Sequence, residues 1–241
     1  MADLAIPFRN DEFLAAELNL PPNPCAIIVL AHGSSPSGKN HPLLAGLAAA
    51  FAERTIACLR FDFPFVTQNK TSPNSDAVLD AAFIAALAYT GARFPGVPLI
   101  AAGKSLGARA AARVVYTLAK SAKPNAREPD AALFLTYPLH PAGRMAPSSI
   151  HGSRGVLTSC QHSSPAAGYP KPMLFIAGTR DPFANCALMR EFAALLPRAE
   201  LYLVDGGDHA LRCAREPESI IEECAAEIAR WLKTIKHAAQ S

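Results

Sequence analysis

The sequence lacks the features that mark membrane, nucleic-acid-binding and secreted proteins. Its 241 residues contain no apolar run long enough to span a bilayer, and residues 1–10 have no basic start followed by an apolar core. The net charge of +3 comes from scattered residues of both signs, and the aromatic residues do not alternate with Lys or Arg. We therefore expect a soluble cytoplasmic protein that binds neither membranes nor nucleic acid, while its oligomeric state stays open.

The six cysteines form neither a C-x-x-C pair nor a regular disulfide framework. Cys160 and His162 make a C-x-H fragment, but it stands without the further ligands that a metal ion requires. Most of the cysteines fit a protein core as small apolar residues. The sequence therefore predicts no metal and no other cofactor.

Half of the residues are hydrophobic, which suffices for a single α/β domain with a buried core over residues 1–241. Short runs rich in Ile, Val, Leu and Phe alternate with Ala- and Leu-rich stretches of helical length, and this alternation predicts a mostly parallel sheet with helices on both faces. The ligand site of such a fold lies at the carboxyl ends of its strands. The expected strands are residues 26–31, 55–61, 99–102, 131–136, 173–177 and 201–204, and the expected helices are residues 41–53, 75–91, 106–121, 183–195 and 217–235.

Two segments do not fit this alternation. Residues 13–18 suit a helix by propensity, but Pro21 and Pro22 follow them, and we predict an edge strand there. Residues 140–170 mix Pro, Gly, Ser and His without an apolar period. A segment of this length and composition predicts a mobile flap or loop insertion.

The stretch from Gly103 to Gly107, GKSLG, is the most informative part of the sequence. An apolar run precedes it and a run of small residues follows it, as in the G-x-S-x-G elbow where a strand turns sharply into a helix and exposes a serine. The strained turn leaves no room for side chains two residues before and after the serine. Ser105 is therefore a candidate nucleophile, although a serine before a helix can also serve only as its N-cap.

Gly-Lys-Ser after a strand also occurs in phosphate-binding P-loops, G-x-x-x-x-G-K-[ST]. That motif requires a glycine where this chain has Pro98, and Gly96 lies two residues too early. The residues from Pro98 to Ala102 form the expected strand itself and leave no length for an open loop. The elbow is the favoured interpretation.

A serine nucleophile requires a histidine base and a carboxylate that orients it, and in this fold they follow the serine in the order acid, then histidine. Asp181 stands at the exit of one expected strand, and His209 follows the next strand on a loop. Asp181 could instead only cap the following helix, and His209 could be a loop residue without a role. Asp205 and Asp208 are weaker alternatives for the acid because they share the loop of the histidine.

An oxyanion hole needs two N–H donors that point at the developing negative charge. The backbone N–H of Leu106, directly after the serine, is the first candidate. The loop after the strand 26–31 supplies the second, with Ser34 as the best candidate and Gly33 or Ser35 as alternatives. His32 in this loop is expected to support it rather than to react.

Six motifs, in this order, resemble the α/β-hydrolase-like domain of testis-expressed hydrolase-like proteins, an NSL chromatin-complex subunit and bacterial relatives close to the dienelactone hydrolases. The resemblance covers about residues 25–235 and implies an α/β-hydrolase fold without a large cap domain, with Ser105, Asp181 and His209 as its triad. It names no substrate, and residues 151–169 depart from the pattern by an insertion. The motifs are AHG with NHP (31–33 and 40–42), LRFDFPF (59–65), GKSLGARAA (103–111), YPLHPAGR (137–144), GTRDPF (178–183) and GGDHAL (206–211).

The sequence thus predicts a serine hydrolase that cleaves a carboxylic ester or thioester of modest size, a small acyl substrate, through an acyl-serine intermediate. Members of the resembling group that act as scaffolds leave a non-catalytic protein-interaction module as the alternative. An acyl pocket is expected from phenylalanines on loops at the strand ends, although core packing explains each equally well. Arg109 and Arg144 could attract an acidic substrate or simply lie in solvent. The candidate pocket residues are Phe61, Phe63, Phe65 and Phe183.

Overall fold

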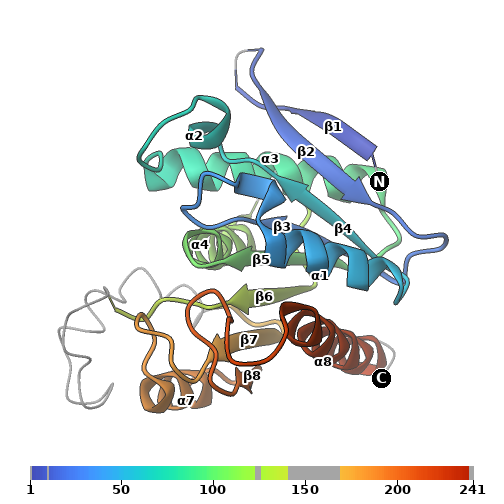
Figure 1. Ribbon diagram of the computed structural model, residues 1–241. Coiled ribbons are helices and arrows are strands. Elements are labelled where there is room, and N and C mark those ends of the chain that lie inside the picture. The colour runs from blue at the N-terminus through green and yellow to red at the C-terminus, as the bar shows by residue number, and fades with distance from the viewer. Residues whose placement is uncertain (1, 10, 123–125, 141–168, 239–241) are drawn as a thin grey trace.

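The computed structural model describes residues 2–9, 11–122, 126–140 and 169–238. They form an eight-stranded sheet in the order β1-β2-β4-β3-β5-β6-β7-β8 (Figure 1). β1 and β2 are antiparallel to their neighbours, and every pair from β4 to β8 is parallel. The strands are β1 (Ala2–Pro7), β2 (Phe13–Asn19), β3 (Ala26–Ala31), β4 (Ile56–Phe61), β5 (Leu99–Lys104), β6 (Ala131–Leu135), β7 (Met173–Gly178) and β8 (Ala199–Val204).

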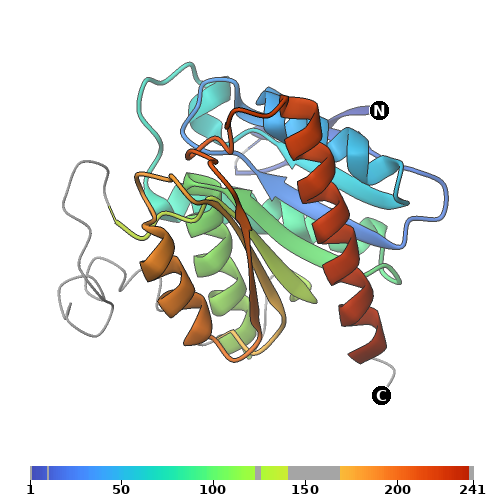
Figure 2. The ribbon, with the colours of Figure 1, turned by 60° about the horizontal axis from the view of Figure 1, so that its bottom comes forward.

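Helices cover both faces of the sheet, so the predicted architecture of a mostly parallel sheet between helices is confirmed (Figure 2). The long helices are α1 (Pro42–Ala52), α3 (Asp76–Arg93), α4 (Leu106–Lys120), α7 (Cys186–Ala194) and α8 (Pro217–Ala238). Two short elements that the sequence did not predict follow β3 and β4, namely η1 (Gly38–Asn40) and α2 (Pro64–Thr67). No helix within the described ranges is long and apolar enough to cross a membrane.

The sheet separates two hydrophobic layers. One layer holds side chains of α1 and α8, among them Leu44 and Trp231, against one face of the central strands. The other layer holds side chains of α3, α4 and α7, such as Phe83 and Val115, against the opposite face. Because successive strand residues point to opposite faces, β5 sends Ile100 and Ala102 into the α1 and α8 layer.

The strand predicted near residues 13–18 is present as β2, but its predicted position at the sheet edge is wrong. β1 pairs along the outer side of β2, in a register that joins Ile6 to Leu14, and occupies the edge itself. No strand is predicted at residues 2–7, because only Leu4 and Ile6 alternate as large apolar residues before Pro7. The burial of Ile6 against the sheet explains why this short strand forms.

Helix α7 begins at Cys186, three residues after the predicted start at residue 183. Asn185 caps it, because its side-chain oxygen accepts a hydrogen bond of 2.8 Å from the Ala187 N–H. The residues from Asp181 to Asn185 therefore remain a loop at the carboxyl end of β7.

Candidate active site

The turn between β5 and α4 places Ser105 at the carboxyl edge of the sheet with φ 54° and ψ −111°, a strained conformation for a residue with a side chain. A Cβ on Gly103 would lie 2.2 Å from the Gly107 carbonyl, and one on Gly107 would lie 2.5 Å from the His32 carbonyl oxygen. The expectation that both positions must lack side chains is confirmed. β5 runs without an intervening loop to Lys104, so the P-loop interpretation is wrong.

The Ser105 hydroxyl does not cap α4, since the structure shows no hydrogen bond from a backbone N–H of that helix to it. Its Oγ lies 2.8 Å from Nε2 of His209. The Ser105 N–H donates to the Leu135 carbonyl at 3.0 Å, which ties the elbow to the end of β6. The side chain is thus left free to interact with the histidine.

His209 joins Ser105 to Asp181. Its Nδ1 lies 2.9 and 2.8 Å from the two carboxylate oxygens of Asp181. The Asp181 side chain is completely buried, whereas that of His209 is 20% exposed. Asp181 Oδ1 also accepts the Phe183 N–H at 2.8 Å, and the Phe183 ring packs on the imidazole with a centroid separation of 4.3 Å. The structure therefore brings the three predicted side chains into one hydrogen-bonded row.

The two alternative acids have other partners. Asp205 accepts a hydrogen bond from the Thr179 hydroxyl at 3.3 Å. Asp208 accepts hydrogen bonds from the backbone and guanidinium of Arg212. Although partial burial raises the pKa of Asp208, these hydrogen bonds outweigh it and hold the pKa below its ordinary value.

A close backbone contact holds the acid against the histidine loop. A Cβ on Gly178, the last residue of β7, would lie 2.1 Å from the Gly207 carbonyl oxygen and 2.8 Å from that of Asp208. The Arg180 N–H donates to the same Gly207 carbonyl at 2.9 Å. Gly206 has φ 71°, which turns the chain back after β8. Glycine at these positions lets the loops that carry Asp181 and His209 meet.

The predicted oxyanion donors lie on the two loops beside Ser105. Leu106 is the first residue of α4, so its N–H has no carbonyl partner within the helix. A Cβ on Gly33 would lie 3.5 Å from the Ser105 Cβ, which brings the loop after β3 against the elbow. Ser34 is exposed, and its N–H makes no hydrogen bond within the described part of the chain. The roles of Leu106 and Ser34 stay predictions.

His32 supports the loop, as the sequence predicts. It is fully buried, its Nε2 accepts the Phe63 N–H at 2.9 Å, and its Nδ1 lies 2.6 Å from the Gly33 carbonyl oxygen. This pair of contacts fits a neutral imidazole that donates from Nδ1. Burial lowers the pKa of His32 and keeps it neutral.

The phenylalanines divide into two sets. Phe61 and Phe63 are completely buried and Phe65 is 3% exposed, and the rings of Phe63 and Phe65 pack edge-on against His32. Core packing therefore accounts for these three, and a contact of any of them with a substrate stays a prediction. Phe183 is half-buried, and its ring lies against the imidazole of His209. Arg109 lies half-buried on α4.

Two basic side chains with lowered pKa values were not predicted from the sequence. Lys104 is only 6% exposed, and the alternation along β5 directs it to the α1 and α8 face. Burial lowers its pKa, although Asp181 and Asp208 act in the opposite direction. Burial also lowers the pKa of His41, the residue before α1, and the charge of Lys104 lowers it further. The motif GKSLG names Lys104, but only the fold shows that it is buried.

Several predicted features lie outside the described residues. These are Arg144, Cys160, His162 and nearly all of the predicted flap at residues 140–170. Within the described ranges no cluster of His, Cys, Asp and Glu could hold a metal ion.

The fold is that of the α/β hydrolases. A family model described as an alpha/beta hydrolase domain matches residues 24–236, and the chain belongs to this family. No curated protein matches the chain at a significant level.

Solved structures with the same fold include esterases and related hydrolases. Est1E from Butyrivibrio proteoclasticus has a TM-score of 0.71 and 14% identity, over 97% of this chain and 100% of that chain. Dienelactone hydrolase from Anabaena variabilis has a TM-score of 0.72 and 14% identity, over 97% of this chain and 96% of that chain. XC6422 from Xanthomonas campestris is described as a serine hydrolase without lid. It has a TM-score of 0.67 and 20% identity, over 95% of this chain and 94% of that chain.

Proposed function

We propose that the protein is a serine hydrolase that cleaves a carboxylic ester or thioester of modest size through an acyl-serine intermediate. The observation that carries this proposal is the row of hydrogen bonds in which His209 lies 2.8 Å from the Ser105 oxygen and within 2.9 Å of both Asp181 oxygens. A serine hydroxyl becomes a good nucleophile only when a base removes its proton, and this row supplies the base and the group that orients it.

In the proposed reaction, Ser105 Oγ attacks the substrate carbonyl carbon while His209 Nε2 takes the hydroxyl proton. Asp181, completely buried, holds the imidazole by Nδ1 and stabilises its charged form. The N–H groups of Leu106 and Ser34 donate to the carbonyl oxygen as it gains negative charge. The bond to the alcohol or thiol then breaks, and His209 returns the proton to this leaving group.

A water molecule completes the cycle. His209 removes a proton from the water, the resulting hydroxide adds to the acyl carbon, and the bond to Ser105 Oγ breaks with return of the proton to the serine. The ring of Phe183, packed on His209, supports an apolar substrate group beside the reacting carbon. The strained backbone of Ser105 presents the hydroxyl for this attack.

Finer features of the proposal rest on the sequence motifs. Their order supports membership of the dienelactone-hydrolase-like group of the testis-expressed and NSL-subunit type. We place the protein in the cytoplasm as one catalytic domain acting on a small acyl substrate. The five cysteines within the described residues are all free, which supports a reducing compartment.

The test is Ser105→Ala, measured by turnover of a short-chain nitrophenyl ester and by labelling with a fluorophosphonate probe. We expect loss of labelling and a fall in rate on the order of a millionfold. Ser219→Ala, an exposed serine on α8, is the matched control and should behave like the wild type. Equal hydrolysis by wild type and Ser105→Ala would refute the proposal. A wild-type protein that reacts with no fluorophosphonate but co-purifies with a defined partner would favour the interaction module.

A further inference from the structure

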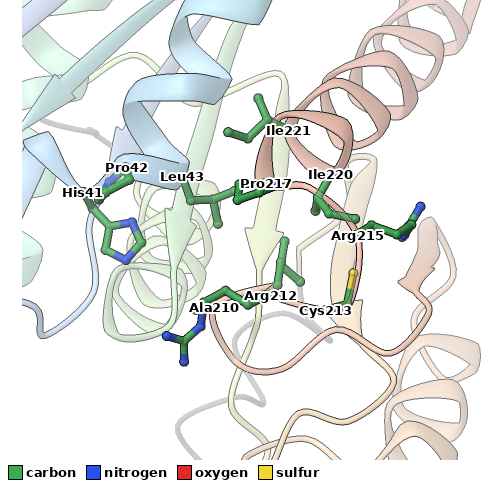
Figure 3. Close-up of a pocket in the computed structure, with 11 residues that line it drawn as sticks. His41, Pro42, Leu43, Ala210, Arg212, Cys213, Arg215, Pro217, Ile220 and Ile221 are labelled. Carbon is green, nitrogen blue, oxygen red and sulfur yellow. The ribbon is translucent and has the colours of Figure 1, made fainter.

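A cavity of about 480 Å³ lies behind the loop that carries His209, between the first turns of α1 and α8 (Figure 3). Its volume is in the range of sites that hold small organic ligands. Most of its lining is apolar and comes from Leu43, Leu211, Ile220 and Ile221. Pro42, Arg212, Arg215 and Pro217 are exposed and form the rim. An apolar chain entering past this rim would leave water for hydrocarbon surroundings.

One polar atom of the lining has no partner. Nδ1 of His41 is buried and makes no hydrogen bond within the described part of the chain. Buried polar atoms in native proteins nearly always have a hydrogen-bond partner, so this atom indicates a ligand or a water molecule. Figure 3 shows the His41 imidazole beside Leu43 at the α1 side of the cavity.

The charges around the cavity favour an anion next to His41. The arginines at the rim are already paired, Arg212 with Asp208 and Arg215 with Glu223. The buried Lys104 acts on His41 by its charge. Asp181 and Asp208 also act on Lys104, but no hydrogen bond or ion pair of its ammonium group occurs among the residues that the structure describes. The positive charge of Lys104 therefore acts on His41 from outside the lining of the cavity.

We propose that this cavity binds a small carboxylate with an apolar chain. The chain lies among Leu43, Leu211 and Ile220, and the carboxylate accepts a hydrogen bond from Nδ1 of His41. Because Ala210 and Leu211 line the cavity directly after His209, the ligand contacts the histidine loop from the side of α1 and α8. This site is separate from the proposed chemistry at Ser105 and does not depend on it.

The experiment is calorimetric titration of the full chain with octanoate and, in parallel, with octanol. His41→Leu removes the hydrogen bond but keeps an apolar side chain, and we expect octanoate to bind about tenfold more weakly, with octanol unaffected. Ile221→Trp fills the cavity and should abolish binding of both. Ile235→Trp is the matched control on the same helix, about 21 Å further along it, and should bind like the wild type.

Ser105→Ala separates this proposal from the proposed hydrolase. Octanoate is expected to bind this variant as it binds the wild type, whatever the result of the activity tests. Binding that disappears in Ser105→Ala would place the carboxylate at the serine and overturn the inference. Unchanged binding in Ile221→Trp, or equal octanoate affinity in wild type and His41→Leu, would overturn it as well.

Discussion

Gly178 is the position where one added methyl group should separate Asp181 from His209. A Cβ there would lie 2.1 Å from the Gly207 carbonyl oxygen, 2.4 Å from its carbon and 2.8 Å from the Asp208 carbonyl oxygen. All three atoms belong to the backbone, so no side-chain rotation relieves the contact. Gly178→Ala must therefore displace the end of β7 from the loop that carries His209.

The size of the displacement follows from the contact itself. Real Cβ atoms essentially never approach another heavy atom more closely than 3.0 Å, so relief of the 2.1 Å contact requires a shift of about 0.9 Å. If the loops separate by that amount, the 2.8 Å contact between His209 and Asp181 lengthens to about 3.7 Å, beyond a hydrogen bond. We expect turnover to fall about a hundredfold. Forced backbone contact should lower the free energy of unfolding by about 1 to 3 kcal/mol.

Two measurements check this prediction: hydrolysis of a short-chain nitrophenyl ester, and urea unfolding followed by circular dichroism. The matched control is Gly96→Ala, because a Cβ on Gly96 meets nothing within 4 Å and its φ is not positive. This control should retain wild-type turnover and unfold at an equal or higher urea concentration. Gly178→Ala behaving like Gly96→Ala in both measurements would refute the argument.

Two further predictions concern buried polar groups. His32 has a lowered pKa because it is buried, so acid protonates it in the unfolded chain first, and stability should fall as the pH drops from 8 through 6.5 towards 5. Urea unfolding at pH 8 and pH 5 should show a smaller loss of stability for His32→Gln than for the wild type. An equal loss in the two proteins would contradict the assignment of this pH dependence to His32. Glu17→Ala removes the partner of Arg60, whose side chain is 3% exposed, and should lower the free energy of unfolding by about 3 kcal/mol. Glu222→Ala, which removes a carboxylate 58% exposed, should cost less than about 1 kcal/mol in the same assay, and similar losses in the two variants would contradict the argument.

The sequence predicted best what short-range patterns encode. The apolar runs located the six strands from β3 to β8, and the spacing of Gly103, Ser105 and Gly107 predicted the strained elbow. Asp181 and His209 could be picked out because each follows an apolar strand at a turn, and strand ends in a parallel sheet meet at one edge. The juxtaposition of these three side chains therefore followed from chain order.

Other features depend on partners far apart in the chain. β1 forms a strand because it pairs with β2 and packs on the core beneath the sheet. Its six residues, which end in Pro7, carry too weak an apolar pattern to predict a strand. The cavity joins the start of α1 to residues about 170 positions later, so no local pattern indicates it. The second oxyanion donor is a backbone N–H, and the side chains of residues 33–35 carry no signal that distinguishes one N–H from another.

β6 contributes no side chain to the row of Ser105, His209 and Asp181, yet it works as the spacer of the site. It lies between β5, which ends before the serine, and β7, which ends before the acid, and two strand spacings amount to about 10 Å. The Ser105 N–H bonds to Leu135 at 3.0 Å and the Thr136 N–H to Ile176 at 2.7 Å, so one peptide ladder fixes both ends of that gap. The distance between the ends of β5 and β7, which the imidazole of His209 bridges, is therefore set by the hydrogen bonds of both strands to β6. Loops above the sheet can change in length without altering this distance.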